Sequence, residues 1–315
     1  MRPTPRPPRQ SLVPPGGIDH HVADMTATFA ADVTLADAQG RLAQHDQWLP
    51  IDGEPTAPLG QLVESNSTGP LRLGYGAWRD LLLGCQFTNG AGELITAGGR
   101  TVKNVAGYDL TKLMVGQHGI FGRIVTITVR TYRKPDAALL ATFEPDVGRL
   151  SALLTTPARP QWSVLTCDAL SCGYLGDART VSFYEAEVPR HGPTRVRRRT
   201  VDEDARHRQQ LWSDHRAFRA AVPPASVGQF VERAGAITWS ADAAFGVVVG
   251  SCDALQPALE RAAHDVGGSI LVFGPNGKPL RLASDPHVQP LLDRLKIAID
   301  PRAALEPLPI PVPAS

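Results

Sequence analysis

Cysteine is scarce in this chain, with four residues among 315. They stand at positions Cys85, Cys167, Cys172 and Cys252, and their spacing matches no metal-binding motif. We therefore expect buried or idle thiols in a reducing compartment, in preference to a disulfide framework. No metal site is predicted.

Long apolar runs are also missing. No segment approaches the roughly 18 consecutive apolar residues that a membrane-spanning helix needs. The N-terminus, MRPTPRPPRQSLVPPGG, is basic and proline-rich and lacks the apolar core of a secretory signal. We interpret residues 1–18 as a disordered leader, with a docking peptide as the alternative.

Neither sign of charge dominates. The 32 lysines and arginines nearly balance the 31 acidic residues, and a net charge of +1 gives no support for a nucleic-acid partner. Residues 195–199, RVRRR, are a local exception, but Asp202, Glu203 and Asp204 follow them closely. No aromatic side chains alternate with these arginines for base stacking, so we interpret the run as a solvated charged loop.

Glycine, by contrast, is bunched between residues 98 and 122. A short helix is predicted over 109–115, with Asp109 as its N-cap and Gly116 at its end. A strand over 123–131 follows, because apolar and polar residues alternate there. Such glycines let backbone N–H groups approach a planar or phosphorylated cofactor, but a tight turn needed only for folding explains the spacing equally well.

Patterns before and after this segment indicate an α+β protein rather than a repeated βαβ fold. The expected elements are a strand over 22–29, a helix over 34–45, a hairpin over 81–97, strands over 162–166, 181–187 and 245–250, and helices over 205–221 and 255–266. We expect three parts, namely the leader 1–18, a first domain 19–136 and an α+β C-terminal domain 137–315.

Three segments carry a family resemblance. The runs KNVAGYDLTKLMVGQHGIFGRIVTITVR (103–130), APLGQLVESNSTGPLRLGYGAWRDLLLGCQFTNGAGELITAGGR (57–100) and RLKIAIDPRAALEP (294–307) resemble the FAD-linked oxidases with a PCMH-type, or vanillyl-alcohol-oxidase-like, FAD-binding domain. Within that family they are most similar to the FAD-binding E subunits of bacterial glycolate oxidases. The resemblance implies a PCMH-type domain with a truncated N-terminal subdomain, followed by a smaller α+β domain.

The same resemblance implies non-covalent FAD, held by two loops that lack bulky cations. The cofactor-binding residues it implies are Gly60, Ser65, Asn66, Ser67, Gly69, Tyr75, Gly76, Gly119, Gly122 and Ile124. Backbone amides and hydroxyls of these types suit a pyrophosphate, although residues 66–70 also read as an ordinary polar turn. For Tyr75 and Arg79 a role in holding the loop together is favoured over a contact with substrate, and Lys103 and Asn104 suit either the cofactor or the loop.

Several positions depart from the family pattern. The early Arg-Gly-Gly-Gly-Thr loop is represented only by residues 15–17, so the first domain is expected to lack it. Gln61 stands in place of glycine, Glu64 in place of alanine, and Arg123 in place of valine. A carboxylate beside a pyrophosphate is unfavourable, so these departures predict weakened or lost FAD binding. Arg123 is expected to point outward.

No catalytic set is visible, and the catalytic residues are left unassigned. The histidine-rich segment of related catalytic subunits has no counterpart here. His118 suits either a base near a flavin or a residue that fills a turn, and the latter is favoured. His20 and His21 are adjacent, and neighbouring side chains diverge on a strand, which disfavours a metal pair.

The resemblance therefore implies an FAD-binding subunit that works beside a catalytic flavin subunit and an iron–sulfur subunit to oxidise glycolate or a related 2-hydroxy acid. The expected location is cytoplasmic, with peripheral attachment to the inner membrane through these partners. A flavin-free scaffold that holds the same partners is the alternative, and an independent oxidase is the weakest of the three interpretations.

Overall fold

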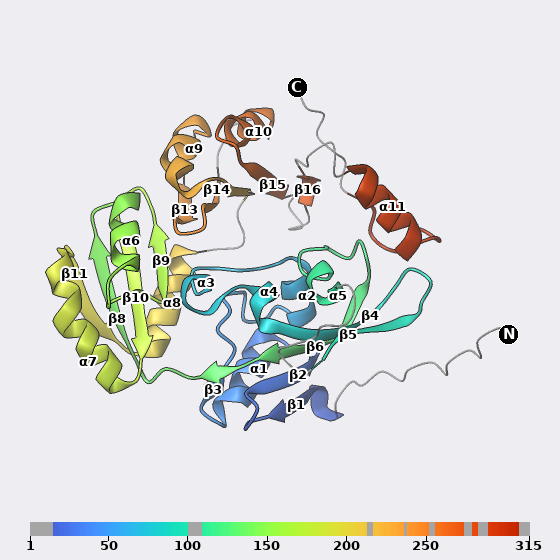
Figure 1. Ribbon diagram of the computed structural model, residues 1–315, viewed down its shortest axis with the longest axis horizontal. Helices are drawn as coiled ribbons and strands as arrows, with labels where there is room; N and C mark the ends of the chain where they lie inside the picture. Colours follow the sequence, from blue (N-terminus) through green and yellow to red (C-terminus); the bar gives the residue numbers. More distant parts are fainter. Residues whose placement is uncertain are drawn as a thin grey trace. The chain divides into compact units, whose positions relative to one another are not determined.

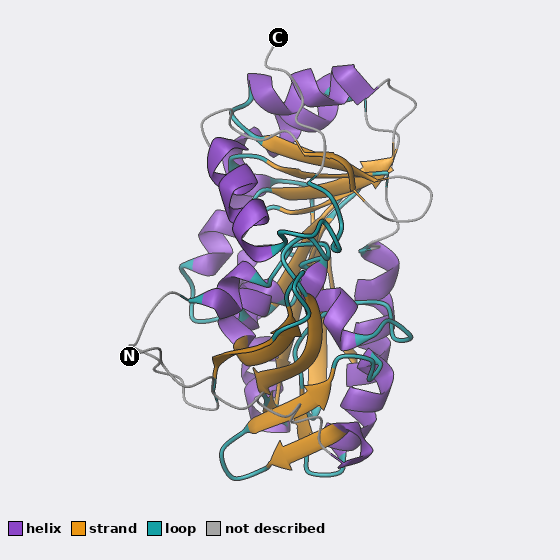
Figure 2. Cartoon of the chain, turned by 90° about the vertical axis from the view of Figure 1, so that its right-hand side faces the viewer, coloured by secondary structure: helices purple, strands orange, loops and turns teal. Residues whose placement is uncertain are grey.

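The computed structural model describes residues 15–99, 109–212, 217–235, 238–251, 256–273, 279–282 and 289–308. Lys103, Asn104, Cys252 and most of the leader lie outside these ranges. The chain divides into two compact units (Figure 1), and neither is continuous in sequence. Unit 1 contains residues up to Ser67, Ala77–Lys134 and Pro290–Leu308, and unit 2 contains Thr68–Gly76 and Pro135–Gln289. Both units mix helices with strands (Figure 2), so the α+β fold class is confirmed.

Unit 1 is built on an antiparallel five-stranded sheet with the order β1-β2-β6-β4-β5. Its elements are η1 (Pro15–Gly17), β1 (Ile18–His21), β2 (Thr26–Ala30), α1 (Leu35–Ala43), β3 (Gln47–Trp48), α2 (Leu59–Glu64), α4 (Trp78–Leu81), β4 (Leu82–Thr88), β5 (Leu94–Gly98), α5 (Leu110–Leu113), β6 (Arg123–Arg130), β7 (Tyr132–Arg133) and most of α11 (Gln289–Ile299).

The helix expected over 34–45 is present as α1. Thr34 caps the helix by accepting a hydrogen bond from the Asp37 N–H, and Leu35, Ala38 and Leu42 form its buried face. The apolar core of unit 1 gathers these side chains with Phe29 and others from the sheet. The predicted hairpin over 81–97 is confirmed as β4 and β5. The helix expected from 109 is also present, since Asp109 caps α5.

Strand β6 is the centre of the sheet, between β2 and β4. Its register against β4 shifts where Phe87 pairs with Ile124 and Gln86 pairs with Thr126, which leaves Val125 as the extra residue of a bulge. Val125 is therefore only half-buried, and Ile124 lies in the core instead.

Unit 2 contains an antiparallel nine-stranded sheet with the order β11-β8-β10-β9-β13-β14-β12-β15-β16. Its elements are α3 (Arg72–Tyr75), β8 (Ala137–Phe143), α6 (Val147–Leu154), β9 (Trp162–Leu165), β10 (Leu170–Gly176), α7 (Ala178–Glu187), η2 (Val188–His191), β11 (Arg195–Arg199), α8 (Val201–Leu211), β12 (Phe218–Ala221), η3 (Pro224–Ser226), α9 (Val227–Arg233), β13 (Thr238–Asp242), β14 (Val247–Ser251), α10 (Gln256–Asp265), β15 (Ser269–Phe273) and β16 (Pro279–Leu282). Its apolar core is made of side chains from this sheet and from α6, α7, α9 and α10.

Four sequence-based expectations are wrong. The segment 181–187 is helical, because Asp177 caps α7 and Val181, Tyr184 and Val188 then fall on one buried face. The helix expected over 205–221 starts earlier, at the Thr200 capping box, and ends at Leu211, while 218–221 form strand β12. The other two wrong expectations concern residues 195–199 and 22–29.

Residues 195–199 form the strand β11 rather than a loop, because their backbone pairs with β8 along its whole length. The strand expected over 22–29 is interrupted by a turn between β1 and β2, where Met25 has a φ of 51°. In β11 pairing with a strand more than fifty residues away decides the conformation, whereas the turn before β2 is closed by local backbone hydrogen bonds.

Cys85 and Cys172 are buried and Cys167 is exposed, and all three are free thiols. Burial raises the pKa of Cys85 to about 12. No helix of the described residues is both long and apolar enough to cross a membrane.

Candidate functional site

The first implied cofactor residue, Gly60, is held in a close contact within unit 1. Its N–H donates to the Ala31 carbonyl at 2.8 Å, and a Cβ at this position would lie 2.8 Å from the Cβ of Ala31. Glycine is therefore required here for α2 to pack against the segment after β2. This packing role is sufficient to explain the residue.

The turn after α2 holds the next three implied residues. The Ser65 hydroxyl donates to the Gln61 carbonyl at 2.8 Å, and Asn66 adopts a left-handed backbone with a φ of 48°. Ser67 is buried, and its carbonyl accepts a hydrogen bond from the indole Nε1 of Trp78 at 2.8 Å. The turn is thus fixed by contacts with α2 and α4.

The second glycine-rich turn lies directly against the first. The Gly116 N–H donates to the Val63 carbonyl at 3.0 Å, and the His118 N–H donates to the Glu64 carbonyl at 2.8 Å. A Cβ on Gly116 would also press against Asn66. Two segments separated by about fifty residues in sequence, both implied in cofactor binding, are therefore joined within unit 1.

Gln117 sets the shape of the second turn, and no sequence feature distinguished it beforehand. Its buried side chain accepts from the Phe121 N–H at 2.7 Å and donates to the Gly122 carbonyl at 2.9 Å. Gly122 is packed so closely against Phe87 that a Cβ would clash. Within the described residues, the N–H groups of Gly119 and Gly122 have no hydrogen-bond partner.

Glu64 lies between the two turns. Its carboxylate accepts a hydrogen bond from the Ile124 N–H at 3.1 Å, so an implied cofactor donor is already engaged. Burial raises the pKa of Glu64, and the Ile124 hydrogen bond and the Arg123 charge oppose that rise. Arg123 itself is exposed, as expected, while Ile124 packs into the core.

The C-terminal resemblance segment packs against the same turn. Lys296 on α11 donates to the Ile120 carbonyl and to the Glu306 carbonyl, both at 2.8 Å. Its third contact is the buried carboxylate of Asp300 at 2.7 Å, and this hydrogen bond lowers the pKa of Asp300 most. The Glu306 side chain also faces Gly119. All three resemblance segments thus have members in unit 1.

The remaining implied residues, Gly69, Tyr75 and Gly76, belong to unit 2. The loop that carries them begins at Thr68, whose carbonyl accepts from the Trp212 indole at 3.2 Å and whose hydroxyl accepts from Arg219 at 2.6 Å. Gly76 has a φ of 89°, which favours glycine.

A buried carboxylate in unit 2 faces the same arginine. Asp242 is 1% exposed, and neither carboxylate oxygen has a hydrogen-bond partner. Burial raises the pKa of Asp242 to about 7, although the charges of Arg72 and Arg219 and the nearby amides after β13 act in the opposite direction. Arg72 in turn stacks over the Phe245 ring at 4.2 Å. Asp242 was not predicted as a site residue, because only its burial distinguishes it.

Among the described residues, the histidines near the two turns and near β1 lie in separate places. His118 has a φ of 52° in its turn. His20 contacts Gln47 at 3.0 Å, whereas His21 pairs with Asp19 at 3.1 Å, so the two imidazoles take different partners. Among the described residues no group of three or more metal-ligating side chains occurs.

Known proteins resemble this chain in part of its length. Glycolate oxidase subunit GlcE of Escherichia coli (strain K12) is 34% identical over 128 residues, which cover 39% of this chain and 36% of that protein. Glycolate oxidase subunit GlcD of Bacillus subtilis (strain 168) is 33% identical over 125 residues, covering 38% and 27%. An uncharacterized FAD-linked oxidoreductase of Mycobacterium tuberculosis (strain CDC 1551 / Oshkosh) is 32% identical over 124 residues, covering 38% and 27%.

The fold has a counterpart among solved structures. An alkyldihydroxyacetonephosphate synthase matches 91% of this chain and 65% of its own length, with a TM-score of 0.64 and 14% identity. No family model matches the chain. The chain thus spans about a third or less of the length of these curated relatives, and the resemblance to FAD-linked oxidases is confirmed over that part.

Proposed function

We propose that this chain is an FAD-binding subunit of a complex that oxidises glycolate or a related 2-hydroxy acid. The similarity to two glycolate oxidase subunits supports the substrate class, and the FAD-linked relative supports the cofactor. The partners in this proposal are a catalytic flavin subunit and an iron–sulfur subunit. FAD, when bound, supplies the redox chemistry, and the protein supplies its binding and orientation.

The observation that carries the proposal is the joining of the two implied loops in unit 1. Gly116 and His118 bind the turn after α2 through their backbone N–H groups, which places the glycine-rich turn beside Asn66. The N–H groups of Gly119 and Gly122 are left as donors of the kind that a pyrophosphate accepts. These two turns would hold the pyrophosphate, and Gly69, Tyr75 and Gly76 stay predictions for the rest of the cofactor.

One contact favours the second candidate, a flavin-free scaffold. The Glu64 carboxylate occupies the Ile124 N–H and brings a negative charge to the junction of the two turns. Both effects oppose a bound pyrophosphate, the first by removing a donor and the second by Coulomb repulsion. In the scaffold alternative the junction is kept for its packing only.

Two substitutions at Glu64 separate these candidates. Glu64→Ala removes the charge and releases the Ile124 N–H, whereas Glu64→Gln removes the charge and keeps an acceptor for that N–H. We expect FAD titration, followed by quenching of flavin fluorescence, to give a binding constant about tenfold tighter or more for Glu64→Ala than for the parent chain. Glu64→Gln should fall between the two if both effects operate.

Gln61→Gly is a second substitution that restores a family residue. Gln61 is exposed on α2 and stands where the family has glycine. Circular dichroism and thermal melting of each variant establish that it remains folded. Folded parent and variant chains that all fail to bind FAD would contradict the proposal and leave the scaffold alternative. Binding by the parent chain that Glu64→Ala weakens would contradict the role given to Glu64.

A further inference from the structure

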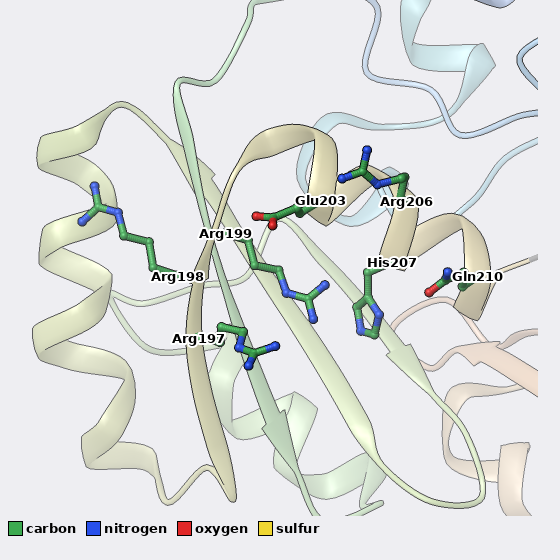
Figure 3. A pocket seen from close by; sticks show the side chains of 7 residues that line it. All are labelled: Arg197, Arg198, Arg199, Glu203, Arg206, His207 and Gln210. Atoms are coloured by element: carbon green, nitrogen blue, oxygen red, sulfur yellow. The ribbon is translucent and has the colours of Figure 1, made fainter.

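Unit 2 contains a basic pocket that the proposed flavin site does not use. It lies between the strand β11 and the helix α8, and its volume is about 400 Å³ (Figure 3). That volume is within the usual range for small-molecule sites. Its lining residues are Arg197, Arg198, Arg199, Glu203, Arg206, His207 and Gln210.

The alternation of β11 sorts its arginines between two faces of the sheet. Arg198 shares a face with Val196, which packs against the core, and its guanidinium pairs with Glu185 of α7 at 3.0 Å. Arg197 and Arg199 point to the opposite face and extend toward His207 of α8 (Figure 3). Two guanidinium groups and an imidazole therefore converge from two elements.

The positive charge of the pocket is only partly neutralised from within, because Glu203 is the one acid of the lining and it interacts electrostatically with Arg199 and Arg206. Among the described residues, Arg197, Arg199 and Arg206 form no ion pair within 4 Å. The single acid, Glu203, is engaged in the cap of α8, where its carboxylate accepts from the Thr200 N–H at 2.8 Å and from the Thr200 hydroxyl at 3.1 Å. Three arginines thus face one carboxylate that already has partners.

His207 adds a neutral donor to this set. Its ring is half-buried, and burial lowers its pKa, as does the nearby charge of Arg199. The imidazole is therefore neutral near pH 7, and one of its nitrogens carries a hydrogen that can be donated. Gln210, one turn further along α8, supplies an amide on the same helix face.

The helix wall of the pocket is held firmly against the sheet. Asp204 and Arg208, on the opposite side of α8, form a buried ion pair beneath the pocket. Both Asp204 oxygens also accept from the Trp162 indole at 3.1 Å. The positions of His207 and Gln210 are therefore set by the core of unit 2, which is what a preorganised site requires.

We propose that this pocket binds the phosphate group of a small phosphorylated molecule. Guanidinium groups match phosphate oxygens with paired, charge-assisted hydrogen bonds, and a phosphate dianion balances the unpaired arginines. The competing interpretation is that the arginines only protect β11, the edge strand of the sheet, from pairing with another chain. That interpretation does not require His207 and Gln210 to converge on the same volume.

The test is calorimetric titration of inorganic phosphate, and separately of glycerol 3-phosphate and succinate, into the full chain at low ionic strength. Arg197→Gln and Arg199→Gln should each weaken phosphate binding by about tenfold or more. Arg195→Gln is the matched control, since it removes the same charge from the same strand at an exposed residue that does not line the pocket, and it should leave the binding constant unchanged. No flavin is needed, so the result is independent of the proposed function.

Thermal melting and sedimentation accompany each titration. The proposal is overturned if the parent chain binds neither phosphate nor glycerol 3-phosphate, or if Arg195→Gln weakens binding as much as Arg199→Gln does. It is also overturned if succinate binds more tightly than either phosphate compound with the same dependence on Arg197 and Arg199. Self-association of Arg197→Gln and Arg199→Gln without any change in phosphate binding would establish edge protection instead.

Discussion

Replacing the buried Asp242 by asparagine should make unit 2 more stable at neutral and alkaline pH. The carboxyl group is 1% exposed, it has no hydrogen-bond partner, and burial raises its pKa to about 7. Arg72 and Arg219 provide a partial counter-charge that does not offset this burial. The ionised carboxylate therefore destabilises the folded chain. Asp242→Asn keeps the size and shape of the side chain and removes its charge.

The magnitude follows from proton linkage. The carboxyl titrates at about 3.8 in the unfolded chain and at about 7 in the folded chain, so the folded state binds more protons between these values. Stability is then lost as pH rises through this interval and is constant above it. Each pKa unit is worth about 1.4 kcal/mol, so from about pH 5 to pH 8 the parent chain should lose roughly 3 kcal/mol relative to Asp242→Asn.

Urea unfolding of both chains at several pH values, followed by tryptophan fluorescence, measures this difference. Trp162, Trp212 and Trp239 all report on unit 2. Asp168→Asn is the control, because it makes the same substitution at an exposed position of unit 2. Unfolding free energies of the parent and Asp242→Asn that run parallel from pH 5 to pH 8 would refute the assigned burial cost.

Three further substitutions test the packing described above. Asp204→Ala leaves Arg208 buried without its partner and should cost about 3–5 kcal/mol in urea unfolding, and an equal stability would contradict the buried pair. Gly173→Ala places a Cβ onto the Trp162 indole, so the soluble yield of folded protein should fall sharply. A melting temperature equal to that of the parent chain would contradict this close packing. Thr34→Ala removes the α1 cap and should cost about 1 kcal/mol.

Local sequence was sufficient to predict a helix where an N-cap residue and the apolar residues after it indicate the same helix. Thr34 starts α1 and Asp109 starts α5, each through the side-chain hydrogen bond that the sequence predicted. The hairpin over 81–97 is equally local, because the turn residues lie between its strands. These elements needed no information from the rest of the chain.

Elements whose pattern is ambiguous could not be predicted. Residues 181–187 alternate well enough for a strand, but the Asp177 cap and the burial of Tyr184 make them helical. The arginines of β11 resemble a loop by composition, and pairing with β8 makes them a strand. In each case a contact outside the window decided the outcome.

The candidate site was likewise predicted only in part. The family resemblance indicated which loops matter, and the structure joins two of them through Gly116 and His118. The carboxylate of Glu64 was singled out by its departure from the family pattern, but its bond to Ile124 spans sixty residues and follows only from the fold. Asp242 had no sequence feature that predicted its burial.

The most direct test of FAD binding is the visible absorption spectrum of the purified chain, alone and co-expressed with candidate partner subunits, followed by acid release of any flavin. We expect flavin absorption bands in at least one of the two preparations, with FAD as the released compound. A folded chain that is colourless in both preparations and still co-purifies with its partners would contradict the FAD-binding proposal and establish the scaffold alternative.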